Sequence, residues 1–214
     1  MIEIWGRRSS SNVQAVLWCL AELNISFTRK DAGYIYGVID TPEYLAMNPN
    51  GTIPTIRDGD NTPLWESGAI LRYLSNTYAP KSFWPHDPAA RAQVDQWAEW
   101  AKINFAGKFT APIFQKLVRT APSKRDYAAI EGAIVVVDKY LDIAEQQLAN
   151  NRYLVGDALT LADIQFAHCL YRYYDIDIKR PERTHLQRYF DLLCDRPAYK
   201  ENIIVSYEEL RIFD

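Results

Sequence analysis

The segment NPNGTIPTIRDGDNTPLWESGAILRYL, residues 48–74, combines two short strand patterns, a turn and the start of a helix. Residues 53–56 predict one strand and residues 63–65 the next, and the cluster Asp58-Gly59-Asp60-Asn61 between them is typical of a hairpin turn. Apolar residues then recur at helical spacing through residues 66–78. The segment therefore predicts a β-hairpin followed directly by a helix.

The residues before this segment predict two further strands and two helices. Residues 2–5 and 25–28 are short strand patterns, and the apolar spacing of Val13–Leu20 between them predicts a helix. Thr41-Pro42-Glu43 predicts a short second helix, because threonine favours the cap and proline the first turn. The order β-α-β-α-β-β-α within about eighty residues predicts an α/β domain with a mixed four-stranded sheet.

The rest of the chain predicts helices only. A proline-punctuated linker at residues 80–87 separates the α/β domain, residues 1–79, from an all-helical bundle at residues 88–214. Within the bundle, apolar residues of 130–148 repeat at alternating spacings of three and four, which is typical of a buried helical face. Helices are expected over residues 94–105, 130–148, 160–174, 182–195 and 197–205.

Composition and charge exclude several classes of function. The 214 residues carry a formal net charge of −3 at pH 7, so no nucleic-acid or membrane partner is expected. No apolar run is long enough to cross a bilayer, and the N-terminus lacks the order of a signal peptide. Three cysteines without a CxxC motif and three scattered histidines predict reduced structural thiols, no metal site and a cytoplasmic protein.

Two motifs carry a resemblance to a known family. The Ile-Pro dipeptide and the Glu-Ser pair within residues 48–74 resemble the glutathione-binding core of cytosolic glutathione transferases. About a hundred residues later, RYLVGDALTLADI (residues 152–164) resembles the glycine turn and capping box of that family's helical domain. The resemblance runs from residue 2 to about residue 195 and indicates a bacterial, serine-type member similar to the theta, nu and phi classes. It implies a thioredoxin-like N-terminal domain that binds glutathione.

An enzyme of this family must stabilise the thiolate of glutathione. A free thiol has a pKa near 8.5, and lowering it by ~2 takes about 2.7 kcal/mol of preferential interaction with the anion. A helix N-terminus contributes roughly 0.3–2 kcal/mol and a hydrogen bond to a charged group about 1.5–3 kcal/mol. A hydroxyl at the start of a helix combines both, and Ser9-Ser10-Ser11-Asn12 supplies such groups directly before the first predicted helix.

Alignment of that helix with serine-type transferases places Ser10 at the thiol-activating position and Asn12 beside it as a second catalytic candidate. Ser9 and Ser11 are expected to contact glutathione, and a shift of one residue in the alignment would give either of them the thiol instead. The other alternative is that these residues only cap the helix, because serine and asparagine are favoured cap residues.

The resemblance also assigns residues to the rest of glutathione. Ile53-Pro54 matches the family's cis-proline dipeptide, in which the first residue pairs its N–H and C=O with the cysteinyl unit. Glu66 and Ser67 open a helix, where the serine and the helix N-terminus can hold the γ-glutamyl carboxylate and the glutamate can hold its ammonium. Thr52 is the candidate for the glycyl carboxylate, with a backbone N–H or the 31–40 loop as alternatives.

Two further groups of residues have predicted roles in the helical domain. Thr160 and Asp163 match the pattern Ser/Thr-x-x-Asp/Glu of a capping box and are expected to be structural. Aromatic residues are expected to wall an apolar co-substrate pocket, although a core position is the alternative for any one of them; the candidates are Trp97, Trp100, Phe105 and Tyr207.

The resemblance implies an enzyme of detoxification that conjugates the glutathione thiolate to an apolar electrophile. Glutathione is a consumed substrate, so no cofactor is expected, and the family's architecture implies a homodimer. Two alternatives stay open. One is a glutathione-dependent isomerase, dehalogenase or peroxidase on the same scaffold, and the other is a non-catalytic module that binds glutathione or another ligand.

Overall fold

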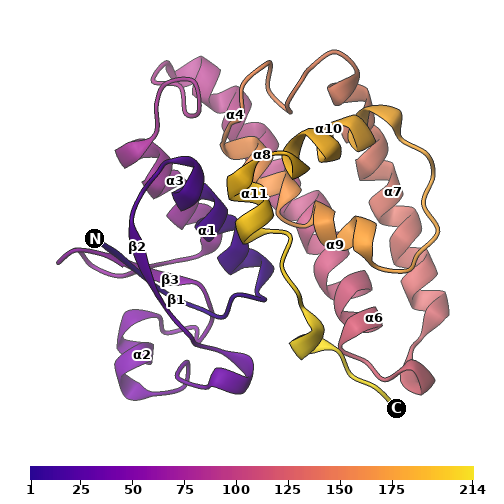
Figure 1. The fold of residues 1–214 in the computed structure, drawn as a ribbon, viewed down its shortest axis with the longest axis horizontal. Coiled ribbons are helices and arrows are strands. Elements are labelled where there is room, and N and C mark those ends of the chain that lie inside the picture. The colour runs from indigo at the N-terminus through magenta and orange to yellow at the C-terminus, as the bar shows by residue number, and fades with distance from the viewer.

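A small mixed sheet forms the centre of the N-terminal half. The computed structural model describes residues 1–214, and its strands are β1 (Ile2–Trp5), β2 (Phe27–Lys30), β3 (Thr55–Asp58) and β4 (Leu64–Trp65). They lie in the order β2-β1-β3-β4, with β1 parallel to β2 and β3 antiparallel to both β1 and β4 (Figure 1). This is the thioredoxin-like mixed sheet that the sequence predicts.

Helices cover both faces of the sheet (Figure 1). They are α1 (Ser11–Glu22), α2 (Pro42–Met47) and α3 (Ser67–Tyr78), with a 3₁₀ turn at Tyr34–Tyr36. The alternation of β1 explains the two layers, because Ile2 and Ile4 point into the core shared with α1 and α3. Trp5 points to the other face, where it packs with Tyr44 of α2 in a separate small cluster.

The second half contains helices only, as predicted. One long helix runs from α4 (Pro88–Trp100) to α6 (Lys116–Val118), with two wide π turns, Ala101–Ala106 and Thr110–Gln115, on either side of α5 (Gly107–Phe109). The predicted linker, residues 80–87, falls between the end of α3 and the start of α4. The remaining helices are α7 (Tyr127–Ala149), α8 (Leu161–Ala167), α9 (Leu170–Asp175), α10 (Thr184–Cys194) and α11 (Pro197–Asn202).

Two strands begin later than the sequence pattern indicates. β2 begins at Phe27 because Asn24, in a left-handed conformation (φ 54°), first leads the chain out of α1. β3 begins at Thr55, since Pro54 has no N–H to contribute to the ladder and Ile53 is left outside the sheet. The second displacement matters for function, because it leaves the backbone of Ile53 without strand partners.

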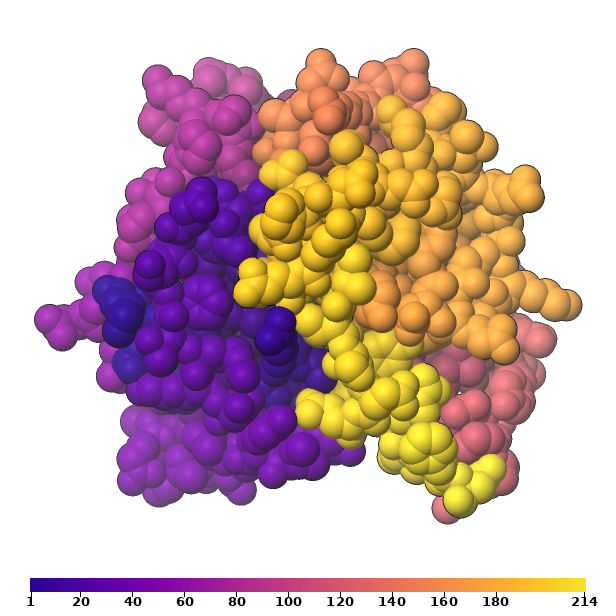
Figure 2. Space-filling model, in the orientation of Figure 1, coloured from indigo at the N-terminus to yellow at the C-terminus, as the bar shows by residue number.

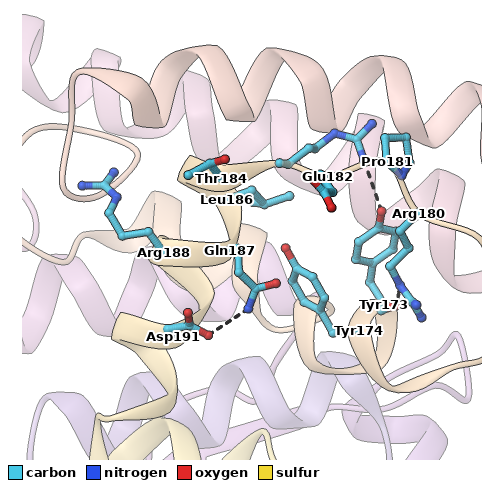
Figure 3. A pocket seen from close by; sticks show the side chains of 11 residues that line it. Tyr173, Tyr174, Arg180, Pro181, Glu182, Thr184, Leu186, Gln187, Arg188 and Asp191 are labelled. Carbon is cyan, nitrogen blue, oxygen red and sulfur yellow. Dashed lines mark hydrogen bonds between the residues drawn. The ribbon is translucent and has the colours of Figure 1, made fainter.

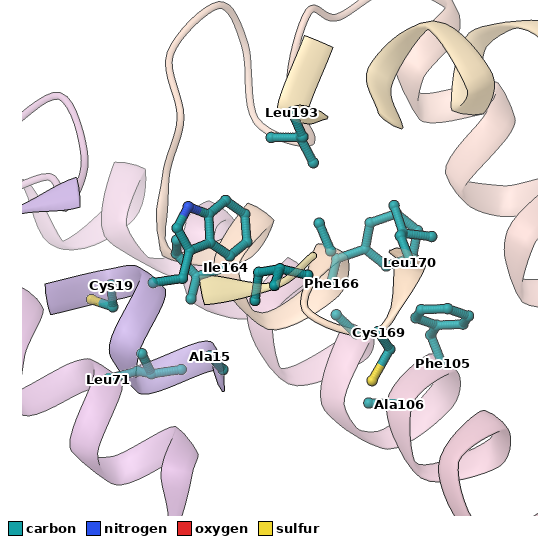
Figure 4. Packing of buried hydrophobic residues seen from close by; sticks show 14 of the residues in the cluster. Ala15, Cys19, Leu71, Phe105, Ala106, Ile164, Phe166, Cys169, Leu170 and Leu193 are labelled. Carbon is teal, nitrogen blue, oxygen red and sulfur yellow. The ribbon is translucent and has the colours of Figure 1, made fainter. Parts of the chain in front are cut away.

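The two halves share one hydrophobic core. Helix α1 contacts α3 of its own domain and α8 and α11 of the helical domain. Trp18 on α1 packs edge-on against Tyr199 on α11, with ring centroids 4.8 Å apart. Apolar side chains of both domains meet around α1 (Figure 4), among them Cys19, Leu71, Ile164 and Leu193. The start of α1 is thereby held between the domains, which fixes the loop that precedes it.

One buried carboxylate holds the turn before α8. Asp163 accepts hydrogen bonds from the N–H groups of Leu154 and Thr160 at 2.9 and 2.8 Å. The hydroxyls of Thr160 and Tyr189 donate to the same carboxylate at 3.0 and 2.9 Å. Thr160 and Asp163 form a capping box, so their predicted structural role is confirmed. Helices α8 and α9 are separate, whereas the sequence predicts a single helix over residues 160–174.

Candidate functional site

Ser10 stands at the start of α1 with its hydroxyl free. Its backbone is extended (φ −83°, ψ 123°), and its C=O accepts a hydrogen bond from the N–H of Gln14 at 2.8 Å, as expected of a helix cap. The side chain nevertheless makes no capping hydrogen bond, although only 8% of the residue is exposed. The capping alternative is therefore wrong for the Ser10 side chain, which presents an unused hydroxyl at the positive end of a helix.

The two neighbouring serines differ from Ser10 in what surrounds their hydroxyls. The Ser9 hydroxyl donates to the carboxylate of Glu209, near the C-terminus. Ser11 is buried in the first turn of α1, where its hydroxyl lies beside the Cys169 thiol. Ser10 combines the cap position with a hydroxyl that makes no hydrogen bond in the protein, so it stays the candidate thiolate partner. The predicted contacts of Ser9 and Ser11 with glutathione stay predictions.

The loop between β1 and α1 packs closely against the residue Ile53, which precedes β3. A Cβ on Gly6 would lie 2.4 Å from Cγ2 of Val13 and 3.4 Å from Cβ of Ile53. Glycine is therefore required for this approach. Asn12 lies in the first turn of α1 with its side chain exposed, and its catalytic role stays a prediction.

The dipeptide Ile53-Pro54 has a cis peptide bond, as the sequence predicts. The N–H and C=O of Ile53 make no hydrogen bond within the protein. The residue before it is fixed, because the C=O of Thr52 accepts hydrogen bonds from the Tyr44 hydroxyl at 2.6 Å and from the Asn48 side-chain amide at 2.8 Å. An extended peptide can pair with Ile53 without displacing a bond of the protein.

Glu66 and Ser67 form a polar corner at the start of α3. Glu66 is exposed and adopts φ 67°, a left-handed conformation that is uncommon for glutamate and that concentrates at functional sites. Ser67 is buried and is the first residue of the helix. Lys102, from the helical domain, places its Nζ 3.3 Å from the Ser67 hydroxyl and 3.6 Å from the Glu66 carboxylate. The corner therefore offers donors, a cation and a carboxylate to a zwitterionic group.

Arg172 is a buried cation next to the Ser10 loop. It is 4% exposed, and its Nη2 donates to the C=O of Ser9 at 2.6 Å and to the side-chain carbonyl of Gln14 at 3.2 Å. Burial lowers the pKa of Arg172 to about 10, so the guanidinium stays charged at neutral pH. The charge lies one residue from Ser10 and favours an anion there.

Three of the four predicted pocket residues pack into the helical domain. Phe105 is fully buried, stacked on Phe109 at 5.6 Å and tilted against Phe166 at 5.0 Å, so we leave it out of the proposed pocket. Trp97 and Trp100 pack on each other with centroids 4.9 Å apart, and Trp100 also contacts Phe166. Both indoles are partly buried and pack against the core of the bundle.

Tyr207 does lie near the Ser10 loop. Its ring packs edge-on against Phe114 with centroids 5.0 Å apart, and the Arg172 guanidinium carbon lies 5.8 Å from its centroid. The Tyr207 hydroxyl donates to the carboxylate of Asp175. Tyr207 and Phe114 are themselves buried, at 4% and 1% exposed, and belong to the core. They form an apolar wall behind the Ser9 backbone rather than the lining of an open pocket.

A cavity of about 640 Å³ lies away from these residues, along α9 and α10 (Figure 3). Its polar groups bond within the protein: Arg183 pairs with Asp138 and Asp142, and the Gln187 amide donates to Asp191. We assign no role in the chemistry to this cavity.

No three His, Cys, Asp or Glu side chains come together as a metal site. None of the helices combines the length and the apolar composition that a bilayer crossing needs.

Two family models match the chain. The model of the glutathione S-transferase N-terminal domain matches residues 9–77, and the model of the glutathione S-transferase C-terminal domain matches residues 109–197. The first match contains Ser10, Ile53-Pro54 and Glu66-Ser67, and the second contains the capping box before α8.

Individual proteins resemble the chain over almost its whole length. Glutathione S-transferase GstB from Escherichia coli strain K12 is 35% identical over 96% of this chain and 99% of that protein. Glutathione S-transferase 3 from Zea mays is 32% identical over 94% of this chain and 93% of that protein. A crystal structure of the theta class glutathione S-transferase from Xanthomonas axonopodis pv. citri, with glutathione bound, is 41% identical, with a TM-score of 0.90 over 96% of this chain and 98% of that one.

Proposed function

The chain belongs to the glutathione S-transferase family, and from this premise we propose that it binds glutathione and transfers the thiolate to an electrophilic carbon. The observation that carries the proposal is the unused hydroxyl of Ser10 at the N-terminus of α1. The unpaired backbone of Ile53 and the polar corner of Glu66 and Ser67 supply the other contacts. Glutathione is consumed in this reaction, so the proposal includes no cofactor.

In this proposal Ser10 donates a hydrogen bond to the glutathione sulfur. The hydroxyl contributes about 1.5–3 kcal/mol in favour of the thiolate, and the N-terminus of α1 contributes roughly 0.3–1 kcal/mol more. The buried charge of Arg172, bonded to the C=O of Ser9, acts in the same direction. Together these terms reach the ~2.7 kcal/mol that lowers a thiol pKa by ~2. Asn12, exposed in the first turn, is a second donor to the sulfur.

The peptide part of glutathione is proposed to lie along the cis-proline segment. Ile53 pairs its N–H and C=O with the cysteinyl unit, and Pro54 turns the chain away. Ser67 and Lys102 bind the γ-glutamyl carboxylate, and Glu66 binds its ammonium. The exposed hydroxyl or the N–H of Thr52 binds the glycyl carboxylate, because the C=O of Thr52 is already engaged.

Replacing Lys102 with methionine is expected to raise KM for glutathione about tenfold with little change in kcat. The reason is that one charge-assisted contact to the γ-glutamyl carboxylate is lost, far from the sulfur. Steady-state kinetics with varied glutathione measure the effect. Lys108→Met, at an exposed position of the same long helix, is the matched control and should keep the wild-type KM. An unchanged KM in Lys102→Met would remove Lys102 from the glutathione site.

The proposed function is tested with the whole protein on two measurements. Retention on immobilised glutathione reports binding, and conjugation of 1-chloro-2,4-dinitrobenzene reports transfer. We expect both to be positive. Binding without turnover of this electrophile, of organic peroxides or of halogenated acids would favour the non-catalytic module, and no affinity at millimolar glutathione would refute the proposal.

We further propose that the protein is a homodimer. Exposed apolar side chains support a partner surface along the long helix and α7, namely Ile103, Val135, Val136 and Ile143. Light scattering should give about twice the chain mass of 24.7 kDa. Val135→Asp is expected to yield monomer, whereas Ile212→Asp, at an exposed apolar position near the C-terminus, should leave the dimer intact. A monomeric wild type would contradict the proposal.

The cytoplasm is the proposed location. Cys19, Cys169 and Cys194 are all free thiols, which fits a reducing compartment. Fractionation of the source cells checks this assignment.

A further inference from the structure

Three guanidinium groups surround the Ser9–Ser10 loop without a carboxylate bound to them. They belong to Arg7, Arg119 and Arg172, and none forms an ion pair within the protein. The other strongly buried arginine, Arg183, is paired with two aspartates, and half-buried Arg196 is paired with a glutamate. Arg172 is buried, and Arg7 and Arg119 are partly buried. Because a cation shielded from water is costly without a counter-charge, three such groups close together indicate that an anion binds there.

Arg7 and Arg119 lie against one aromatic ring. Their guanidinium carbons are 5.7 and 4.9 Å from the centroid of Tyr34, and the Nε of Arg7 is buried without a hydrogen-bond partner. Burial, and next the charge of Arg119, lowers the pKa of Arg7. Two like charges with unused donors are thus held near each other, and an anion between them would stabilise both.

The third guanidinium stands beside the apolar wall behind the Ser9 backbone. Arg172 lies 4.6 Å from the ring centroid of Phe114 and 5.8 Å from that of Tyr207. It also bonds the C=O of Ser9, so its charge lies next to the place of the sulfur. Phe114 and Tyr207 are buried, whereas the Tyr34 ring beside Arg7 and Arg119 is 41% exposed. The cluster therefore combines cations with an accessible aromatic face, a combination that suits an amphipathic small molecule better than a purely apolar one.

A carboxylate of the protein already reaches this cluster. Glu209 accepts hydrogen bonds from the hydroxyls of Ser9 and Tyr36, the latter at 3.2 Å. Its negative charge favours the protonated form of Arg7 and so acts to raise the pKa of that residue. Figure 2 shows the C-terminal segment that carries Glu209, in yellow, lying across the boundary between the N-terminal half and the helical domain. The position thus accommodates a carboxylate, supplied by an exposed residue of the chain end.

We propose that the arginine cluster binds a carboxylate group of the electrophile, so that the preferred co-substrates are carboxylate-bearing electrophiles. The guanidinium forks of Arg7 and Arg119 match a carboxylate in bidentate geometry, and the exposed ring of Tyr34 beside them is available to its apolar part. The inference rests on the proposed function, because it concerns the molecule that meets the glutathione thiolate beside Ser10.

With a chloronitrobenzoate as electrophile, the reaction is a substitution at the ring. The thiolate sulfur gives an electron pair to the carbon that carries chlorine, and a C–S bond forms. The C–Cl bond then breaks, and chloride leaves with the bonding pair. The carboxylate takes no part in the bond changes and only holds the ring in place.

The test compares 4-chloro-3-nitrobenzoate with its neutral analogue, 4-chloro-3-nitrobenzamide. Each enzymatic kcat/KM is divided by the uncatalysed rate constant with glutathione, which removes the difference in intrinsic reactivity between the two rings. We expect the wild type to prefer the carboxylate by about tenfold or more on this scale. Arg119→Gln should lose about tenfold of the preference, because one guanidinium partner of the carboxylate is removed. Arg119 is only partly buried and forms no ion pair in the protein, so we expect this variant to fold.

Two further variants serve as a control and as a change of opposite sign. Arg152→Gln is the matched control, since its guanidinium also lies over a tyrosine, 5.9 Å from the ring centroid of Tyr153, but away from Ser10; the preference should stay at the wild-type value. Glu209→Gln removes a competing negative charge and keeps a hydrogen-bond acceptor. It should raise the preference for the carboxylate, a change opposite in sign to that in Arg119→Gln.

Several results would overturn the inference. Equal use of the two electrophiles by the wild type, or an unchanged preference in Arg119→Gln, would refute it while leaving conjugation in place. A rise in KM for glutathione that is the same with both electrophiles would mean that Arg119 binds a carboxylate of glutathione instead. If the wild type conjugates neither these electrophiles nor 1-chloro-2,4-dinitrobenzene, the proposed function fails, and the inference fails with it.

Discussion

Replacing Ser10 with alanine is expected to lower kcat/KM for conjugation at pH 7 by about tenfold to 25-fold. A bound thiol with a pKa near 6.5 is roughly three quarters ionised at pH 7, whereas a thiol at its ordinary pKa of 8.5 is about 3% ionised. The upper value applies if the whole shift depends on the hydroxyl. The lower value applies if the N-terminus of α1 and the buried charge of Arg172 retain part of the shift.

The pH dependence of kcat/KM separates this role from a structural one. For Ser10→Ala the midpoint should move upward by about 1–2 pH units, so that activity returns under alkaline conditions. Ser26→Ala, at an exposed position of the same domain, is the control for a generic serine substitution. A loss that is uniform across pH would show that Ser10 positions the loop rather than the thiolate. The same displacement in Ser9→Ala or Ser11→Ala would move the assignment by one residue.

The second large effect concerns stability rather than catalysis. Asp163→Asn is expected to lower the free energy of unfolding by about 3–5 kcal/mol. The carboxylate of Asp163 accepts four hydrogen bonds inside the protein, two from N–H groups and two from hydroxyls. An asparagine keeps one oxygen and turns an NH₂ group toward the remaining donors, so buried donors are left without acceptors.

Denaturant unfolding at pH 7 measures this effect. The matched control is Asp157→Asn, which removes the same charge at an exposed position a few residues earlier and should change the midpoint little. Circular dichroism of the folded baseline confirms that each variant keeps its helices before unfolding. Equal midpoints for Asp163→Asn and the wild type would mean that the buried network does not support the fold.

Features set by short stretches of sequence could be predicted. The hairpin before α3 depends on turn residues next to each other, and the capping box depends on two residues three positions apart. The family resemblance identified Ile53-Pro54 as a cis dipeptide, which the structure bears out. Strand ends were predicted less well, because the start of β3 depends on how Pro54 meets a neighbouring strand and not on the local alternation of side chains.

The residues that complete the site from the other domain could not be predicted. Lys102 reaches Ser67 across 35 positions of sequence, and Arg172 reaches Ser9 across 163 positions. Nothing in their local sequence marks them, since a lysine or an arginine on a helix usually faces solvent. Only the packing of the helical domain against the N-terminal domain brings Lys102 to the start of α3 and Arg172 to the loop before α1.

The composition of the co-substrate pocket was predicted only in part. Aromatic residues at helical spacing indicate an apolar face, but periodicity does not tell whether that face meets a cleft or the core. Phe105 and Tyr207 both belong to the core, although Tyr207 lies near the proposed site, where Arg172 stands beside it. A sequence pattern does not show that a cation such as Arg172 is buried without a carboxylate to pair with.

A crystal structure with glutathione bound tests the central claim most directly. We predict the sulfur within hydrogen-bond distance of the Ser10 hydroxyl, the cysteinyl backbone paired with Ile53, and the γ-glutamyl group at Ser67. A sulfur that contacts Ser9 or Ser11 instead, or that lies away from the N-terminus of α1, would contradict the assignment of Ser10 as the thiolate partner.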